Sequence, residues 1–155
     1  MLLIEASIKS LGYLLPPSPV PAGAYIPAVK TGNLIFTAGM IPTQSGEVKF
    51  AGKIGAELTL EQGGKAAVMC LLNALAAIKG IVGDLDKIER AVKLCGYVNS
   101  APGFTEQHKV MNYASELLQK IFGEKGKHAR IAVGMTELPL NAAVELDLIV
   151  EIKAA

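Results

Sequence analysis

The sequence predicts a single α+β domain in which two helices pack on one face of a β-sheet. Two long segments, 59–83 and 105–122, carry apolar residues at helical spacing. The segments before, between and after them are rich in β-branched residues, and the later ones alternate apolar with polar side chains. Helices that are few, long and interleaved with grouped strands are typical of a sheet covered on one side. A chain of 155 residues fits one domain.

The first 22 residues are expected to form a short helix and an extended arm. Apolar residues recur at helical spacing within 2–11, and Gly12 follows as a stop signal. The segment 15–21 then contains four prolines, which exclude both a helix and a central strand. Nothing before the arm is long enough to be a domain, so we treat 1–155 as one unit.

The remaining elements follow from turn signals and capping residues. A capping box, Thr59 with Gln62, opens the first long helix, and Gly83 ends it. The two C-terminal strands are joined by a short segment, 138–141, and are expected to pair with each other as a hairpin. The expected strands are 28–30 and 34–40, which form a first hairpin, then 47–50, 88–98, 130–135 and 144–151.

The second face of this sheet is still strongly apolar. The run Leu34-Ile35-Phe36 has apolar side chains on both sides, which indicates a strand covered on both faces. Two helices cover only one face, so we expect the other to be covered by further copies of the chain.

Composition excludes several classes of function. The net charge is +1 without a basic run, and aromatic residues make up 5%, so nucleic acid is an improbable partner. There is no signal-peptide pattern, and the most apolar stretch, 66–82, is interrupted by Lys79 and Gly80, so no membrane partner is expected. Cys70 and Cys95 lie in apolar segments and are expected to be buried reduced thiols of a cytoplasmic protein.

Metal and nucleotide motifs are missing from the sequence. His108 and His128 are far apart and no metal-ligand spacing occurs, so no metal site is expected. The segment 63–65 (GGK) lies inside a helix and not in a phosphate-binding loop.

Arginine usage gives the first indication of a site. The chain has two arginines, and Arg130 begins a strand between apolar neighbours. A planar guanidinium suits the bidentate binding of a carboxylate, which makes Arg130 a candidate ligand-binding residue. The alternative is an ion pair with Glu145, Asp147 or Glu151 of the following strand, and spacing alone leaves both interpretations open.

Three segments resemble signatures of the RidA/YjgF family, once labelled L-PSP endoribonucleases. The segment 32–42 (GNLIFTAGMIP) is similar to the family's GN-hydrophobic-SGQ-P stretch. The segment 128–139 (HARIAVGMTELP) is similar to its R-x-x-V-x-V-x-x-L-P signature, and 144–147 (VELD) to the V-E-hydrophobic-E strand that follows. The resemblance covers roughly residues 23–152, and the N-terminal helix with its arm resembles a longer subgroup of about 155 residues.

The resemblance implies a chorismate-mutase-like fold with a mixed sheet, assembled as a homotrimer with three clefts between subunits. The best-studied branch hydrolyses reactive enamines and imines, such as 2-aminoacrylate, to 2-oxo acids and ammonia without a cofactor. Arg130 matches the arginine that holds the substrate carboxylate, and Glu145 the glutamate that positions the attacking water. The positions that match cleft-lining residues are Tyr25, Gly39, Asn112 and Ala132.

Two departures from the family pattern bear on the substrate. Ala38 replaces a serine and so removes a polar contact, whereas Ala132 replaces a cysteine whose backbone faces the ligand. The sequence therefore predicts an imine or enamine deaminase that binds a small carboxylate. A non-catalytic module that binds 2-oxo acids is the alternative, and an endoribonuclease is a weaker one.

Overall fold

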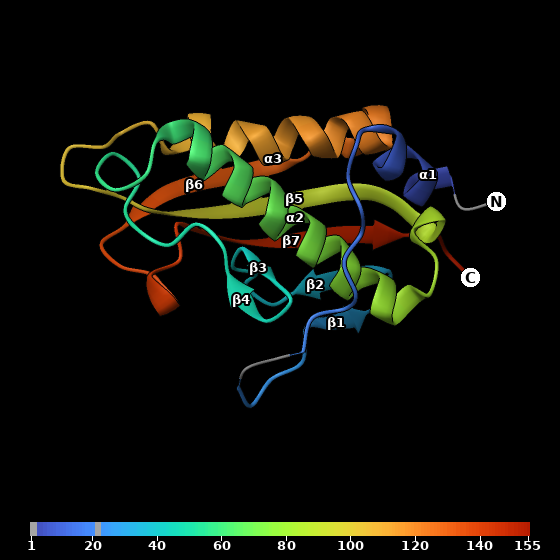
Figure 1. The fold of residues 1–155 in the computed structure, drawn as a ribbon. Coiled ribbons are helices and arrows are strands. Elements are labelled where there is room, and N and C mark those ends of the chain that lie inside the picture. Colours follow the sequence, from blue (N-terminus) through green and yellow to red (C-terminus); the bar gives the residue numbers. More distant parts are fainter. Residues whose placement is uncertain (1–2, 21–22) are drawn as a thin grey trace.

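The computed structural model describes residues 3–20 and 23–155, which form an α+β fold (Figure 1). The helices are α1 (Leu3–Ser10), α2 (Leu60–Val82) and α3 (Gln107–Phe122), with short 3-10 helices η1 (Leu85–Lys87), η2 (Gly123–Gly126) and η3 (Pro139–Asn141). The strands are β1 (Ala28–Thr31), β2 (Leu34–Thr37), β3 (Thr43–Gln44), β4 (Glu47–Val48), β5 (Ile88–Asn99), β6 (Ala129–Met135) and β7 (Val144–Ile152). The predicted elements are present. Residue 2 of the expected helix and residues 21–22 of the expected arm lie outside the described residues.

The main sheet has the strand order β1-β2-β7-β5-β6 and is mixed. Strands β5 and β6 run parallel, and the other neighbouring pairs are antiparallel. Strands β3 and β4 form a separate two-stranded sheet, so the strand expected at 47–50 is shorter than predicted and pairs locally. The edges of the main sheet are β1 on one side and β6 on the other.

The predicted pairing of the two C-terminal strands is wrong. Strand β7 lies between β2 and β5, and β6 pairs with β5 after the crossover through α3. Burial explains this placement, because β7 has fully buried apolar side chains at every second residue, whereas β6 has no residue that is fully buried. The more apolar strand takes the centre of the sheet, where it gains two neighbours.

Helices α2 and α3 cover the same face of the main sheet, as predicted (Figure 1). The capping box at the start of α2 is present, with the Thr59 amide donating to Gln62 Oε1 at 2.8 Å and the Gln62 amide donating to Thr59 Oγ1 at 3.1 Å. Gly83 ends the helix with φ +77°. By length and composition α2 resembles a membrane span, but 72% of its most apolar window is buried inside the fold, as expected for a core helix.

The other face of the main sheet is open and apolar. Val29, Phe36 and Ile131 are 49%, 39% and 45% exposed, and all three point away from the helices. Within one chain the strand at 34–36 is thus covered on one face. Both cysteines are free, with Cys70 buried as predicted and Cys95 half-buried on this open face.

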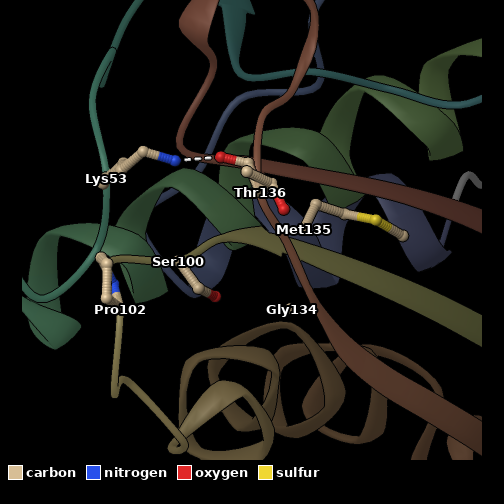
Figure 2. Close-up of a pocket in the computed structure, with 6 residues that line it drawn as sticks. All are labelled: Lys53, Ser100, Pro102, Gly134, Met135 and Thr136. Atoms are coloured by element: carbon tan, nitrogen blue, oxygen red, sulfur yellow. Dashed lines mark hydrogen bonds between the residues drawn. The ribbon is translucent and has the colours of Figure 1, made fainter.

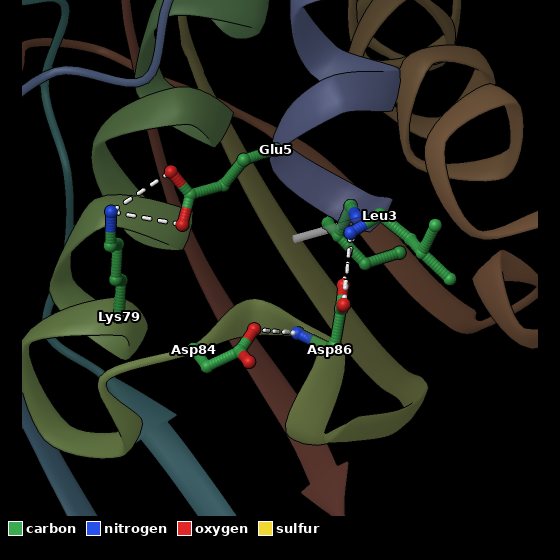
Figure 3. Close-up of polar contacts among 6 residues, drawn as sticks. Leu3, Glu5, Lys79, Asp84 and Asp86 are labelled. Carbon is green, nitrogen blue, oxygen red and sulfur yellow. Dashed lines mark hydrogen bonds and ion pairs between the residues drawn. The ribbon is translucent and has the colours of Figure 1, made fainter. Parts of the chain in front are cut away.

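The N-terminal segment is attached to the domain at the end of α2. The Asp86 carboxylate accepts hydrogen bonds from the Leu3 and Ile4 amides at 2.9 and 2.8 Å, so a side chain distant in sequence caps α1 (Figure 3). Glu5 forms an ion pair with Lys79 at 2.9 Å, and Ile8 is buried in the core. The arm that follows then crosses the surface of α2 (Figure 1).

Candidate active site

Arg130 lies near the start of the edge strand β6 and points toward α3. It is in register with the buried Leu94 on β5, so its side chain is on the helix-covered face of the sheet. Its Nη1 donates to Asn112 Oδ1 at 2.8 Å and to Ser115 Oγ at 3.1 Å. Its Nη2 donates to the His108 carbonyl at 3.3 Å. The guanidinium is therefore held by about two turns of a single helix.

This arrangement leaves part of the guanidinium available. A guanidinium has five N–H donors, and three of those in Arg130 are used by the contacts with α3. Within the described residues, Nε–H has no acceptor and Nη2 has one, so the edge of the guanidinium formed by Nε and Nη2 keeps a free donor. This edge of an arginine is one that carboxylate oxygens bind. Partial burial lowers the pKa of Arg130 from its ordinary value, but the group stays protonated at any physiological pH.

Glu145 belongs to a different part of the molecule. It lies on β7 between Val144 and Leu146, both completely buried under the helices, so its side chain points to the open face. A Cβ on Gly39 would overlap Glu145 Oε1, so the carboxylate lies directly over the Gly39 backbone. Burial, and then the nearby Asp147 charge, raise the pKa of Glu145 above its ordinary value.

A polar cluster surrounds Glu145 on the open face. Tyr97 on β5 donates its hydroxyl to Asp147 Oδ2 at 3.1 Å. Burial together with the Asp147 charge raises the pKa of Tyr97 to about 12, so the phenol stays protonated and the hydrogen bond persists. The carboxylates of Glu145 and Asp147 on β7 therefore share the open face with a neutral donor, the Tyr97 hydroxyl of the neighbouring strand β5.

The remaining predicted site residues fall at both edges of the sheet. Ala132 follows Arg130 on β6, on the same face, and packs against the core. Because β6 is an edge strand, alternate backbone groups around Ala132 point away from β5. Tyr25 precedes β1 at the opposite edge and is 53% exposed. Four strand spacings of about 4.8 Å, or about 19 Å, separate β1 from the strand that carries Arg130.

Within one chain, the predicted site residues thus form two groups, and the two groups lie apart from each other. Arg130, Asn112 and Ala132 form one set, and Glu145 with Gly39 forms the other, on the opposite face of the sheet. An ion pair between Arg130 and a carboxylate of β7 is therefore wrong, because the bonds of Arg130 go to α3.

Two residues near Arg130 were missed by the sequence analysis. Ser115 accepts from Arg130 and lies 2.9 Å from His128 Nε2. The available signals were spacings: Ser115 follows Asn112 by one helical turn, and His128 precedes Arg130 by two residues, which places them on one side of an extended segment.

A pocket of about 310 Å³ opens at the carboxyl ends of β5 and β6. Lys53 lines it and donates to the Thr136 carbonyl (Figure 2). Lys53 also donates to Asn99 Oδ1 at 3.1 Å. Gly134 also lines the pocket and lies four residues beyond Arg130, about 13 Å along the strand. Neither Arg130 nor the residues that bind its guanidinium line this pocket. Among the described residues, no group of three or more histidine, cysteine or acidic side chains could hold a metal ion.

Comparison with known proteins identifies the family. Residues 5–152 match the family described as "YjgF/chorismate mutase-like, putative endoribonuclease". The curated Protein TCP17 of Trypanosoma cruzi is 41% identical over 150 residues, which cover 96% of this chain and 94% of that protein.

Solved structures agree in fold over almost the whole chain. A protein of unknown function from Agrobacterium tumefaciens is 44% identical with a TM-score of 0.90, covering 98% of this chain and 94% of the other. A "putative endoribonuclease" from Shewanella oneidensis is 32% identical with a TM-score of 0.92, covering 96% and 99%. YjgF of Escherichia coli, 24% identical with a TM-score of 0.62 and covering 88% and 94%, shares the fold. The predicted chorismate-mutase-like fold is confirmed, and the chain belongs to the RidA/YjgF family.

Proposed function

We propose that this protein is a cytoplasmic homotrimer that hydrolyses 2-imino acids and their enamine tautomers to 2-oxo acids and ammonia. The observation that carries the proposal is the state of Arg130. Its guanidinium is held on α3 by three hydrogen bonds, and the edge formed by Nε and Nη2 keeps donor capacity for a ligand. A small molecule with a carboxylate is the chemistry that this edge fits.

The reaction needs few catalytic groups. In an imino acid, the protonated C=N carbon is already electrophilic, so water adds to it once the two are held in place. The C–O bond forms as the C=N π bond breaks, and the carbinolamine then loses ammonia to give the 2-oxo acid. A carboxylate that accepts one proton from the attacking water supplies the acid–base chemistry, and we assign this role to Glu145.

A second copy of the chain would supply the carboxylate. Arg130 and Glu145 lie on opposite faces of one sheet, so a single chain cannot present both to one small ligand. The open face that carries Glu145 and Gly39 also carries the exposed apolar side chains Val29, Phe36 and Ile131. Burying that face against another copy would remove this apolar surface from water, and if the β6 edge of the copy borders it, Glu145 and a neighbouring Arg130 would meet.

The experiment is to generate 2-aminoacrylate from serine with a dehydratase and to measure the rate of pyruvate release. We expect the wild-type protein to accelerate release in proportion to its concentration, and Glu145→Gln to remove the acceleration while the chain still binds pyruvate. Release at the uncatalysed rate, in the presence of folded wild-type protein, would refute the proposed reaction.

A non-catalytic carboxylate-binding module is the second candidate, and one observation favours it. Ala38 stands where the family pattern has serine, and its amide donates to the Pro27 carbonyl at 2.8 Å, so this position offers the cleft no side-chain donor. A binding module would give the opposite pattern from an enzyme: saturable binding of 2-oxobutyrate in calorimetry, and no acceleration of pyruvate release.

The names of several similar proteins suggest endoribonuclease activity as a third candidate function. The charge of +1 argues against it, because phosphate contacts need clustered lysine or arginine. We expect RNA binding to be weak and steeply sensitive to salt. Tight RNA binding at 150 mM salt, or RNA cleavage that is lost in Arg130→Ala, would reverse this order of preference.

A further inference from the structure

We infer that Ser115 and His128 are positioning residues that fix the Arg130 guanidinium through a directed chain of hydrogen bonds ending at the Gly126 carbonyl. The chain runs from Arg130 Nη1 to Ser115 Oγ at 3.1 Å, from Ser115 to His128 Nε2 at 2.9 Å, and from His128 Nδ1 to the Gly126 carbonyl at 2.6 Å. The inference rests on the proposed function only where it speaks of ligand affinity.

The direction of each bond follows from the groups at the two ends. A backbone carbonyl can only accept, so His128 Nδ1 must carry a proton and donate it to Gly126. In the neutral ring Nε2 is then the acceptor, and the Ser115 hydroxyl donates to it. At the other end the Arg130 guanidinium can only donate, so it donates to the Ser115 oxygen. Every donor in the chain meets an acceptor.

Burial makes this chain rigid. Ser115 is 8% exposed and lies on the core-facing side of α3, between Ala114 and Leu118, which are fully buried. A buried hydroxyl without partners is costly, so Ser115 keeps both bonds and its oxygen lone pair stays directed at Arg130. Gly126, which ends the chain, is also buried.

The consequence is the orientation of the free edge of the guanidinium. Without Ser115, the guanidinium would be held only by Asn112 and by the 3.3 Å bond to the His108 carbonyl, and both of these residues are exposed. Ser115 adds a buried second acceptor to Nη1, which restricts rotation of the plane and so fixes the direction of the edge formed by Nε and Nη2. An arginine held in this way pays less conformational entropy when it binds a carboxylate.

A serine–histidine pair of this geometry also resembles a hydrolytic nucleophile with its base, but the contacts exclude that role. The Ser115 oxygen accepts from a guanidinium, which lowers its nucleophilicity, and the residue is buried against the core. Ser115 therefore acts through Arg130 and does not touch the ligand.

The first arm of the test needs no ligand. The chain has two histidines, and Arg130 contacts the backbone of His108 and not its ring, so His108→Gln leaves His128 as the only imidazole. Two-bond 1H–15N spectra of this variant at pH 8 should show the His128 proton on Nδ1 and no proton on Nε2.

A second variant, Arg90→Lys, leaves Arg130 as the only arginine. Its two Nη signals should be separate, because rotation of the guanidinium is slow. Adding Ser115→Ala should merge them.

The second arm measures ligand affinity by calorimetry with 2-oxobutyrate. We expect Ser115→Ala to weaken affinity about 3- to 10-fold, the loss of one hydrogen bond. In the Arg130→Ala background, the same change should have no further effect. His128→Leu should weaken affinity as Ser115→Ala does, and His128→Gln should restore most of it, because a carboxamide can accept from Ser115 and donate to Gly126.

Thr37→Val is the matched control for the second arm. Thr37 is also a buried hydroxyl and accepts from the Leu148 amide at 2.9 Å, but it has no contact with Arg130. Both Thr37→Val and Ser115→Ala should lower the melting temperature, and only Ser115→Ala should weaken binding.

The outcomes separate this inference from the proposed function. A proton on His128 Nε2, unmerged Nη signals in Ser115→Ala, or an affinity loss that persists in the Arg130→Ala background would each overturn the positioning role. If the wild type binds no 2-oxo acid but the spectra are as expected, the proposed function fails and the hydrogen-bonded chain stands.

Discussion

Removing the Arg130 side chain tests the site most directly, because its contacts predict two effects of different size. Arg130→Ala deletes the donor edge that we assign to a ligand carboxylate and the three donors that bind α3. Arg130→Lys keeps the charge and loses the planar pair of donors. We expect both variants to fold and to bind 2-oxo acids more weakly, the alanine variant more than the lysine variant.

The two magnitudes follow from the surroundings of the guanidinium. Loss of an ion pair with a ligand in a desolvated cleft costs about 2–5 kcal/mol, or about 30- to 5,000-fold in affinity. The cost to the free energy of unfolding is smaller, because two of the three abandoned acceptors, on Asn112 and His108, are exposed residues that water can reach. We expect about 1 kcal/mol, which for a chain of this size is a fall of about 2–4 °C in melting temperature.

Calorimetric titration of 2-oxobutyrate, beside thermal melting of the same samples, measures both quantities. Asn112→Ala is the comparison variant, because it removes one support of Arg130 and leaves the free donors in place, so it should weaken binding less than Arg130→Ala. The reasoning is refuted if Arg130→Ala keeps wild-type affinity, or if its melting temperature falls so far that the affinity loss reflects unfolding.

Three further predictions concern other parts of the molecule. Burial and Asp147 raise the pKa of Glu145, so the acidic limb of the pH–rate profile should have its midpoint above glutamate's ordinary 4.5. Since the folded state keeps the proton to a higher pH than the unfolded state, the free energy of unfolding should fall as pH rises from 4.5 through the raised pKa. Glu145→Gln should remove both pH dependences, and an unchanged slope in either would contradict the assignment. Ile131→Glu puts a charge on the open apolar face, so light scattering should show a trimer for the wild type and a smaller species for the variant; a monomeric wild type at micromolar concentration would sink the proposed assembly. Gly96→Ala should destabilise the fold by about 1–3 kcal/mol, because the new Cβ overlaps the buried Met111 side chain, and denaturant titration would disprove this by showing equal midpoints.

Local signals in the sequence were sufficient to predict the helices and most of the strands, and Arg130 as a candidate ligand-binding residue. The capping box at Thr59, the glycine stop at Gly83 and the alternation in 144–151 each depend on residues close in sequence, so they could be read without the fold. Asn112 was assigned to the cleft only by family resemblance, and its hydrogen bond with Arg130 at 2.8 Å became visible only in the fold.

The pairing of the C-terminal strands could not be predicted from such local signals. The segments 130–135 and 144–151 are joined by a short connection, which favours a hairpin on local grounds, yet the pairing is decided by burial across the whole sheet. The same limit applies to Ser115 and His128. Each looked unremarkable alone, and they form a chain only because α3 and the start of β6 lie side by side.

Asp86 connects the beginning and the end of the described chain. Its carboxylate caps α1 at Leu3 and Ile4, while its backbone carbonyl accepts from Lys153 Nζ at 2.8 Å. Leu3 and Lys153, near the two ends of the described chain, are thus both held by Asp86. A short peptide could therefore join them into a circle, and new ends could be opened at the exposed turn around Gly103. Such a permuted chain would carry a fused reporter beyond the carboxyl end of β5, without altering any residue of the site.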